Sequence, residues 1–429
     1  MCAYKGTSQR GLLSISSSEL NVYSSVMHVV VVGAGPTGMV LSMVLARAGI
    51  RVTLLEKEST TDERPRAAHL TPPTMRLLGR AGLAESVRRQ GWTPNNFAWR
   101  KLDGTVLTSI EDFAQSKNVD SMVVLPLGPL GKIILDHASR EDNITIKFNH
   151  SVVGVGQDEQ SAWARVRSED GSEFQVAGDY LVGCDGGTSS VRKSLYGPRN
   201  FPGQTWDERL IASNVIYPVE KFGWDDLNTI IHPSHRALVA KITQEGLWRV
   251  SYIEDKALSY EEARNNVANH YATLLPGNPK PEDFTLVDFS FYSQHQRCAE
   301  KFRVGRVLLA ADAAHLCNPW GGMGLTGGFA DVAGLAECLE GIYTGKADES
   351  ILDKYDEVRR DIFHTVISPI STANYLRVAS DPDKVNVLET DPFLKMVHAA
   401  KADPIVKEKL DKGAYAVLHD FTQYYNNKK

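Results

Sequence analysis

The chain has 429 residues, of which 42% are hydrophobic and 23% are charged, and its formal net charge at pH 7 is −5. This composition is typical of a globular protein with a sizeable core, and the length allows two domains or one elaborate domain. A weakly acidic chain without a basic block argues against a protein that binds nucleic acid or an anionic membrane surface, and no apolar run is long enough to span a bilayer.

The five cysteines contain no C-x-x-C pair, so the sequence indicates neither a disulfide framework nor a zinc site, and we expect no metal. A reducing compartment is the simplest interpretation of such cysteines, and we expect a cytoplasmic protein. Residues 1–25 are polar and rich in Ser, which predicts a flexible extension and not a signal peptide.

The stretch from Val26 to Glu56 combines a Val-rich strand, a glycine-rich turn, a helix and a second strand. In such a unit the first Gly permits a tight turn, the second lets a pyrophosphate approach the backbone, and the third lets helix and strand pack closely. The helix N-terminus attracts phosphate, and an acidic residue after the second strand can bind ribose hydroxyls. These residues predict a dinucleotide site and leave open whether it holds NAD, NADP or FAD. They are Gly33, Gly35, Pro36, Thr37, Gly38, Glu56 and Lys57.

Helices and strands alternate after this unit. Thr71 is a good helix cap and is followed by two prolines, so we expect a helix that continues through Leu83. The turn Asp103-Gly104 predicts a hairpin between Phe97 and Leu107. The next predicted elements are a helix at Gly128–Arg140, a strand at Ile144–Phe148, and an antiparallel meander at Ser151–Val155, Ala162–Val166 and Phe174–Val176.

A second glycine-containing motif, Gly183 to Arg192, follows a strand predicted at Asp179–Val182. Beyond it, hydrophobic and polar residues mostly alternate up to Phe291, which predicts an antiparallel sheet with one face available as the floor of a substrate pocket. The predicted strands are Leu210–Tyr217, Ala237–Ile242, Leu247–Ile253 and Phe284–Phe289, and one helix, Ser259–Leu274, interrupts them.

A third motif joins a buried strand, Val304–Ala310, to Asp312 and then to a glycine-rich turn that opens a helix. Leu352 to Leu376 predicts another long helix, and the C-terminal part is helical as well. Because no Pro/Gly linker marks a break, we expect the domains to be interleaved in sequence.

The three motifs, in this order, resemble those of single-component FAD-dependent aromatic hydroxylases of the para-hydroxybenzoate hydroxylase and phenol hydroxylase type. Gly33–Gly38 with Glu56 is similar to the first fingerprint of that family, Gly183–Arg192 to its Asp-Gly motif, and Gly305–Pro319 to its Gly-Asp motif. The resemblance covers about Met27 to Leu376.

The resemblance implies an α/β fold in which a Rossmann-like FAD-binding domain is interleaved with an antiparallel-sheet substrate domain and followed by a helical C-terminal part. The expected division is an extension at 1–25, an FAD-binding domain at 26–96, 129–200 and 292–345, a substrate domain at 97–128 and 201–291, and a helical region at 346–429.

The resemblance also implies roles for matching residues. Glu56 would bind the adenosine ribose of FAD, and Asp312 would bind the ribityl chain. The turn containing Gly322, Gly324 and Leu325 would lie at the flavin pyrimidine edge, where a helix dipole stabilises the negative charge of reduced flavin. Other implied contacts are Arg66 near the pyrophosphate, Asp185 and Arg192 where FAD and the nicotinamide donor compete for one surface, and Pro319 and Trp320 beside the flavin and the substrate.

Two departures from the family pattern concern the third motif. Ala311 stands where the family usually has Gly, which narrows the approach to the flavin by one methyl group, and Thr326 replaces a common Asn. The chain also lacks a Trp-x-Trp-x-x-Pro motif, which argues against a flavin halogenase.

The implied activity is that of a monooxygenase that uses NADPH or NADH and O2 to hydroxylate a phenolic or polyketide-like aromatic compound through a flavin C4a-hydroperoxide. A small aromatic molecule and O2 would be its partners; a homodimer is considered, and the oligomeric state is left open. Baeyer–Villiger insertion or epoxidation on the same fold is an alternative, and an FAD-binding reductase or binding protein without oxygen transfer is another.

A phenol reacts faster as phenolate, so a base near its hydroxyl group would help. From the sheet side we consider Tyr292 and His295 for this role, with His232 and His235 as further options. An apolar, partly aromatic pocket is expected for the ring. Trp224 and Phe291, together with Pro319 and Trp320, are the residues expected to contact it.

Overall fold

A computed structural model describes residues 26–62, 69–111, 113 and 119–426. The extension predicted at 1–25 and the predicted pyrophosphate contact Arg66 therefore lie outside the described residues. Within the described ranges, no helix combines the length and the apolar character needed to cross a membrane.

The Val-rich strand of the first motif forms the centre of a six-stranded sheet, ordered β17-β18-β11-β1-β2-β7. β1 (His28–Val32) pairs in parallel with β2 (Arg51–Leu55) on one side and with β11 (Tyr180–Gly183) on the other. Almost every residue of these three strands is buried, so both faces of the sheet are covered, which explains why its strands are apolar runs without alternation. The outer strands are β7 (Ile144–Lys147), β18 (Val307–Leu309) and the short antiparallel β17 (Arg303–Val304).

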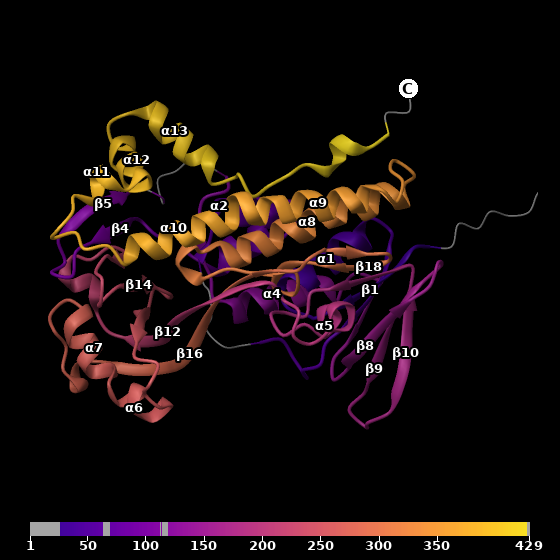
Figure 1. The fold of residues 1–429 in the computed structure, drawn as a ribbon, viewed down its shortest axis with the longest axis horizontal. Coiled ribbons are helices and arrows are strands. Elements are labelled where there is room, and N and C mark those ends of the chain that lie inside the picture. The colour runs from indigo at the N-terminus through magenta and orange to yellow at the C-terminus, as the bar shows by residue number, and fades with distance from the viewer. Residues whose placement is uncertain (1–25, 63–68, 112, 114–118, 427–429) are drawn as a thin grey trace, which may run out of the picture.

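The helices around this sheet come from distant parts of the chain (Figure 1). α1 (Pro36–Arg47) packs against both α4 (Leu127–Ala138) and the long α8 (Met323–Tyr343). This packing brings the first and third glycine motifs together. Further elements of this part are α2 (Pro72–Arg80), α3 (Ala84–Gln90), α5 (Ser190–Tyr196), the pair β3 (His69–Leu70) and β6 (Val123–Val124), and the meander β8 (Ser151–Gln157), β9 (Ala162–Arg167) and β10 (Glu173–Gly178).

The second large sheet has eight strands, ordered β19-β16-β12-β15-β14-β13-β4-β5. All neighbouring strands are antiparallel except β13 and β4, which are parallel. Its strands are β4 (Phe97–Arg100), β5 (Val106–Ile110), β12 (Gly203–Ile216), β13 (Leu227–Ile230), β14 (Ala237–Lys241), β15 (Leu247–Glu254), β16 (Thr285–Cys298) and β19 (His315–Leu316).

The two faces of this sheet differ in character. One face carries a hydrophobic core that includes Ile211, Val250 and Phe289 and packs against α6 (Tyr260–Asn265) and α7 (Val267–Leu274). Because side chains alternate along a strand, the residues between these positions lie on the other face. That second face carries polar groups such as Asn214, and α10 crosses part of it (Figure 1).

The C-terminal part is helical, as expected. α9 (Ile351–Ile362) continues through one wide π-helical turn, Phe363–Ile367, into α10 (Ser368–Val378). Three short helices follow, and two of them bury Val387, Leu394 and Val397 against Trp99 of β4. They are α11 (Val387–Thr390), α12 (Pro392–Ala400) and α13 (Pro404–Gly413).

The predicted fold class is confirmed, with four local corrections. The helix predicted at Ser259–Leu274 is two helices that meet at Asn266, whose side chain donates to Glu254 Oε2 over 3.1 Å. β16 extends to Cys298, well beyond the predicted end. The predicted strand Val304–Ala310 is a hairpin turned at Gly305, and β13 is a strand that the sequence pattern did not indicate. The domain division stays a prediction, and β16 runs through its boundary at 291/292.

Candidate active site

In the glycine turn between β1 and α1, the fold itself requires two of the glycines but not the third. Gly33 has a φ of +103°, and a Cβ there would lie 2.5 Å from the Cys184 carbonyl oxygen; a Cβ on Gly38 would lie 2.0 Å from the Gly33 oxygen. A Cβ on Gly35, by contrast, meets no described atom within 4 Å. The open space above Gly35 would allow the close backbone approach that a pyrophosphate needs.

The groups around this turn suit a dinucleotide. Glu56 follows β2, and its Oε2 accepts a hydrogen bond from the Ala34 N–H over 2.7 Å, so the carboxylate lies against the glycine turn. The N-cap of α1 is Gly35, and no side chain among the described residues caps the helix. Free N–H groups and the helix dipole favour phosphate at this position.

The N-terminus of α8 is open in the same way. Its N-cap, Gly322, has a φ of 63°, no described side chain caps the helix, and a Cβ on Gly322 would meet nothing within 4 Å. The two open helix ends belong to one region, because a Cβ on Gly328 of α8 would lie 3.1 Å from Thr37 Cγ2 and 2.8 Å from Ala311 Cβ. The exposed carboxyl group of Asp312 lies beside Ala311. These features fit the pyrophosphate, ribityl and pyrimidine parts of FAD.

The second motif is joined to the third by an arginine. Arg192 donates through Nη1 to the Ala313 carbonyl over 2.9 Å and through Nη2 to that of Gly187 over 2.6 Å. Asp185 caps the start of α5 by accepting from Ser189 Oγ over 2.5 Å and from the Ser190 N–H over 2.6 Å. Burial raises the pKa of Asp185, and these hydrogen bonds oppose the rise. Its predicted part in competition between two cofactors stays a prediction.

A buried ionic cluster lies behind the third motif. Asp331 accepts from Ala311 N–H over 2.9 Å, from His315 Nε2 over 2.7 Å and from Arg359 Nε over 2.7 Å. Burial works to raise the pKa of Asp331, but the two basic neighbours outweigh it and hold that pKa below its ordinary value. His315 is thus a structural partner of this cluster.

The segment that contains Pro319 and Trp320 is attached to the polar face of the eight-stranded sheet. Trp320 Nε1 donates to Gln294 Oε1 over 2.7 Å, and Asn318 Nδ2 donates to Gln296 Oε1 over 2.9 Å. Gln294 and Asn318 are fully buried. Two glutamine side chains of β16 therefore hold the predicted flavin-side loop in place.

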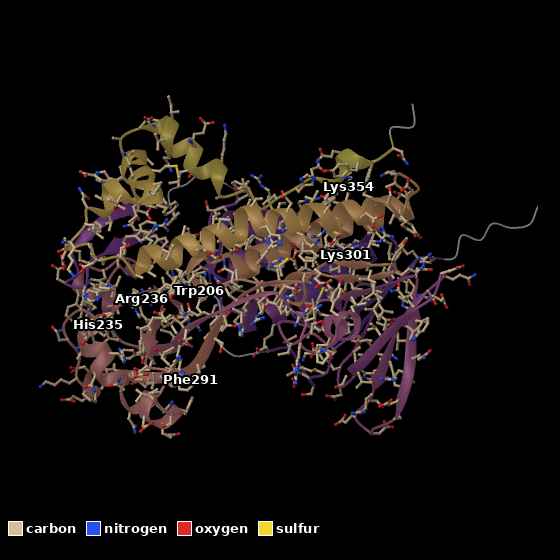
Figure 2. All side chains as sticks on the ribbon, viewed as in Figure 1. Trp206, His235, Arg236, Phe291, Lys301 and Lys354 are labelled. Carbon is tan, nitrogen blue, oxygen red and sulfur yellow. The ribbon has the colours of Figure 1, made fainter. Side chains whose placement is uncertain are left out.

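The predicted base and substrate residues are divided between the two faces of β16. Tyr292 shares a face with Gln294 and Gln296, whereas Phe291, labelled in Figure 2, and His295 lie on the face toward α6. There the Tyr260 ring contacts the Phe291 ring at a centroid distance of 5.5 Å. His295 Nδ1 bonds Thr205 Oγ1 over 2.8 Å.

Trp224 also packs on the α6–α7 side of the sheet, and His232 Nδ1 accepts from the Ser234 and His235 N–H groups over 3.1 and 2.9 Å. The structure therefore brings Tyr292 and Trp320 to the polar face and leaves Trp224, Phe291 and His295 on the opposite one. The roles of all these residues stay predictions.

Comparison with known proteins agrees with this geometry. A family model described as FAD binding domain matches residues 26–368. The chain is 37% identical over 357 residues to para-nitrophenol 4-monooxygenase of Pseudomonas sp. (strain WBC-3), an alignment that covers 82% of this chain and 88% of that protein. The chain belongs to the family of FAD-dependent aromatic hydroxylases.

Two further proteins extend the comparison. The hydroxylase is 32% identical over 349 residues to 6-hydroxy-3-succinoylpyridine 3-monooxygenase of Pseudomonas putida (strain DSM 28022 / S16), covering 81% of this chain and 88% of that one. The crystal structure of p-nitrophenol 4-monooxygenase from Pseudomonas putida DLL-E4 superposes with a TM-score of 0.85 at 34% identity, covering 92% of this chain and 99% of that chain.

Several polar residues that the hydroxylase places near this region were not predicted from the sequence. Gln294 and Gln296 alternate along β16, and this period of two was a usable signal beyond the predicted end of the strand. Arg249 lies between buried Trp248 and Val250 in β15, and this alternation also marks it as a residue of the opposite face. His69 carried no recognisable signal, because the chain before it has no regular pattern.

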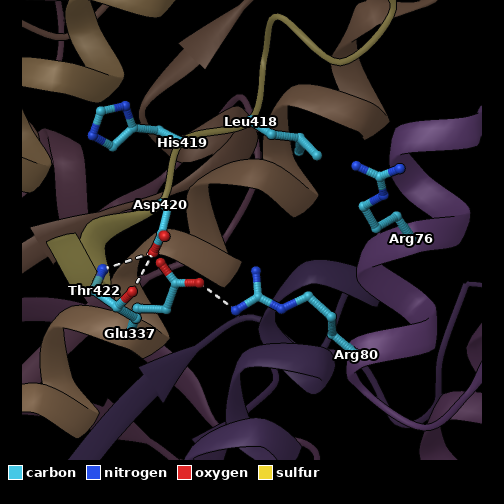
Figure 3. A pocket seen from close by; sticks show the side chains of 7 residues that line it. All are labelled: Arg76, Arg80, Glu337, Leu418, His419, Asp420 and Thr422. Atoms are coloured by element: carbon cyan, nitrogen blue, oxygen red, sulfur yellow. Dashed lines mark hydrogen bonds and ion pairs between the residues drawn. The ribbon is translucent and has the colours of Figure 1, made fainter. Parts of the chain in front are cut away.

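A surface pocket of about 450 Å³ lies elsewhere on the hydroxylase, between α2, α8 and the C-terminal segment (Figure 3). Two basic residues border it, and one of them, Arg80, pairs with Glu337. It contains none of the glycine-motif residues. Its lining residues are Arg76, Arg80, Glu337, Leu418, His419, Asp420 and Thr422.

Proposed function

We propose that this hydroxylase uses NADPH or NADH and O2 to oxygenate a small phenolic ring at the carbon para to its hydroxyl group, and that the substituent on this carbon leaves as the new C–O bond forms. Its similarity to two monooxygenases over most of their length carries this proposal. Their names specify a single ring with a hydroxyl group and an electron-withdrawing substituent, and oxygen transfer at the position para to that hydroxyl. The use of O2, oxygenation at the para position and the use of NADPH or NADH are proposals for this chain.

The open space above Gly35 supports the cofactor assignment. FAD bound there would accept electrons from the nicotinamide and activate O2. The chain would supply the rest: Glu56 for the adenosine ribose, Asp312 for the ribityl chain, and the N-terminus of α8 for the negative charge of the reduced ring. The loop that carries Trp320, fixed to β16, would separate this region from water. Exclusion of water matters because it prevents loss of reactive oxygen species before transfer.

The test is a reconstitution and turnover experiment. Purified protein is loaded with FAD, and oxidation of NADPH and of NADH is followed with and without para-nitrophenol and other para-substituted phenols. We expect a yellow protein, substrate-stimulated nicotinamide oxidation and O2 uptake, and a product oxygenated para to the original hydroxyl group, with the nitro group of para-nitrophenol released as nitrite. Failure to retain FAD, or retention without stimulated O2 uptake, contradicts the proposal. A ring-expanded ester or an epoxide would instead identify Baeyer–Villiger or epoxidation chemistry.

A further inference from the structure

His69 presents a buried nitrogen without a partner at the junction of the two large parts of the fold. Its ring bonds the backbone of Lys241, yet Nε2 is buried and no described residue hydrogen-bonds to it. Since Nδ1 then donates to the Lys241 carbonyl, the neutral ring carries its lone pair on Nε2. A buried acceptor without a donor is costly, so such an atom indicates a missing partner that donates a hydrogen bond.

Arg249 supplies positive charge beside this acceptor. It lies on β15 opposite Asn214 of β12, and its Nε donates to Asn214 Oδ1 over 3.1 Å. Arg249 pairs with Ala240, the residue before Lys241, whose backbone bonds the His69 ring, so Arg249 and His69 belong to one region of the fold. Burial, and after it the charge of Arg249, lower the pKa of His69 to about 4, so the imidazole is neutral at pH 7. Lys241 lies nearby as well, but its ammonium group faces the rings of Trp92 and Trp248 at 6.0 and 5.9 Å.

The surroundings place this pair next to the candidate flavin region. Two residues after His69, Thr71 Oγ1 bonds Thr326 Oγ1 in the first turns of α8 over 2.9 Å. His69 also pairs with Val124 of β6, which belongs to an apolar cluster with Ile242, Trp92 and Leu247. A polar pair thus lies beside apolar walls, close to the open N-terminus of α8, which is the combination that an aromatic ring with one hydroxyl group requires.

We propose that His69 Nε2 accepts the hydrogen bond of the substrate's phenolic O–H group and that Arg249 faces the same oxygen. The inference rests on the proposed function and adds the two residues that recognise the phenol. When the phenol binds, the O–H proton moves to Nε2, the O–H bond electrons stay on oxygen, and Arg249 stabilises the phenolate that forms before oxygen transfer. Ring compounds that lack an O–H group, such as aryl ethers, are then poor ligands.

The first test measures whether the O–H group is recognised by His69. Binding of 4-nitrophenol and of its methyl ether, 4-nitroanisole, to FAD-loaded protein is measured by calorimetry, without nicotinamide. We expect the parent protein to prefer the phenol by roughly ten-fold or more, the value of a buried hydrogen bond. His69→Asn keeps a donor for the Lys241 carbonyl but has no nitrogen at the Nε2 position, so the preference should disappear. His398→Asn, on the exposed face of α12, is the matched control and should keep it.

The second test measures the charge of the bound oxygen. The phenolate form of 4-nitrophenol absorbs visible light, and the neutral phenol form does not. Difference spectra recorded below the pKa of the free compound therefore report whether the bound ligand is ionised. We expect the phenolate band with the parent protein, a reduced band with Arg249→Lys, and loss of the band with roughly ten- to hundred-fold weaker binding with Arg249→Met. Arg165→Met, on the exposed meander strand β9, is the control for removal of an arginine.

The outcomes separate this inference from the proposed function. A phenol preference that persists in His69→Asn, a phenolate band that persists in Arg249→Met, or FAD-loaded parent protein that binds neither probe overturns the inference. If the preference for the phenol and the phenolate band are both as expected but O2 uptake is not stimulated, the proposed function is contradicted and the inferred phenol site is supported. The FAD content of each variant, read from its absorbance, shows whether a lost preference or a lost phenolate band reflects misfolding. A His69→Asn protein with full FAD content and unchanged turnover also contradicts the inference.

Discussion

Ala311 donates its backbone N–H to the buried carboxylate of Asp331 over 2.9 Å while it holds a φ of 57°. A non-glycine residue in this left-handed region costs about 1–2 kcal/mol, so the surrounding structure must impose it. Asp331 does so from α8, where its carboxylate pairs with Arg359 and accepts a hydrogen bond from His315. The backbone just before Asp312 is therefore set by a carboxylate 20 residues later in the chain.

Replacement of Asp331 by Asn should therefore destabilise the fold strongly. The change leaves Arg359 buried without its counter-charge, which costs about 3–5 kcal/mol. Urea unfolding, read as the free energy of unfolding, measures the loss. Asp353→Asn serves as the control, because Asp353 pairs with Arg303 at the surface, where its side chain is 74% exposed, and should change stability by about 1 kcal/mol or less. Equal losses in both variants would show that the Asp331 cluster contributes nothing special.

Ala311 and Gly328 should behave as a coupled pair. A methyl group added to Gly328 would lie 2.8 Å from Ala311 Cβ, so Gly328→Ala should be destabilising on its own. Ala311→Gly removes that obstacle and the strained φ, so the double variant should be more stable than the sum of the single changes predicts. We expect a coupling of about 0.5–3 kcal/mol in a double-mutant cycle of unfolding free energies. Strict additivity would show that a methyl group on Gly328 does not meet Ala311.

Gly35 and Gly38 should differ sharply when each is changed to Ala. A Cβ on Gly35 meets nothing within 4 Å, so Gly35→Ala should fold with nearly unchanged stability and lose affinity for FAD. Gly38→Ala should fail to fold or be severely destabilised, because its methyl group would lie 2.0 Å from the Gly33 oxygen. Thermal unfolding without cofactor, together with FAD titration, checks both. Unchanged FAD affinity in Gly35→Ala would show that the open space is not the pyrophosphate site.

The stability of the protein should increase with pH through the titration of His69. Its pKa is lowered to about 4, first by burial and then by Arg249. An unfolded chain has a His pKa of about 6.5, so between these values the unfolded state binds a proton that the folded state does not. The free energy of unfolding therefore rises by about 3 kcal/mol from pH ~4 to ~6.5 and is constant above that range. In urea titrations at several pH values, the free energy of unfolding of His69→Asn should lack this rise with pH. The other titrating groups are the same in both proteins, so their contributions cancel when the two free energies are subtracted.

Trp320→Phe should loosen the loop beside the predicted flavin edge. The change removes the 2.7 Å hydrogen bond to Gln294, whose fully buried Oε1 is left without that donor, at a cost of about 1–3 kcal/mol. If the loop excludes water during turnover, the variant should release more hydrogen peroxide per nicotinamide oxidised than the parent protein. A peroxide yield identical to that of the parent would argue against a role for this hydrogen bond in turnover.

The elements that carry strong local signals could be predicted from sequence. The strand, glycine turn, helix and second strand from Val26 to Glu56 combine hydrophobic pattern and turn chemistry in one place, and the structure agrees. β13 could not be predicted, because its four residues, Leu227–Ile230, acquire strand geometry only from pairing with β4 and β14 on either side. Tertiary pairing of this kind leaves no local periodicity.

The candidate site divides in the same way. Residues in glycine motifs were found because the motif itself has a physical reason for each position. Residues that recognise substrate come from strands whose two faces look alike in sequence, so Phe291 and Gln294 could not be assigned to opposite faces before the register with β12 was known. His69 and Arg249 are 180 residues apart in number and meet only through the folding of two sheets onto one another.

The wide turn at Phe363–Ile367 has a consequence for how this long helix tolerates insertions and deletions. A π-helical turn holds one residue more than an α-helical turn, so it changes the direction in which the side chains of α10 point around the helix axis. Thr372, which accepts from Gln296 over 2.7 Å, and Tyr375, which donates to Glu208 over 2.7 Å, meet the sheet only at the present phase. Deletion of one residue here would rotate α10 by about 100°, carrying both groups off the sheet without breaking the helix. The length of this turn is therefore a sequence constraint independent of the chemical identity of any residue in it.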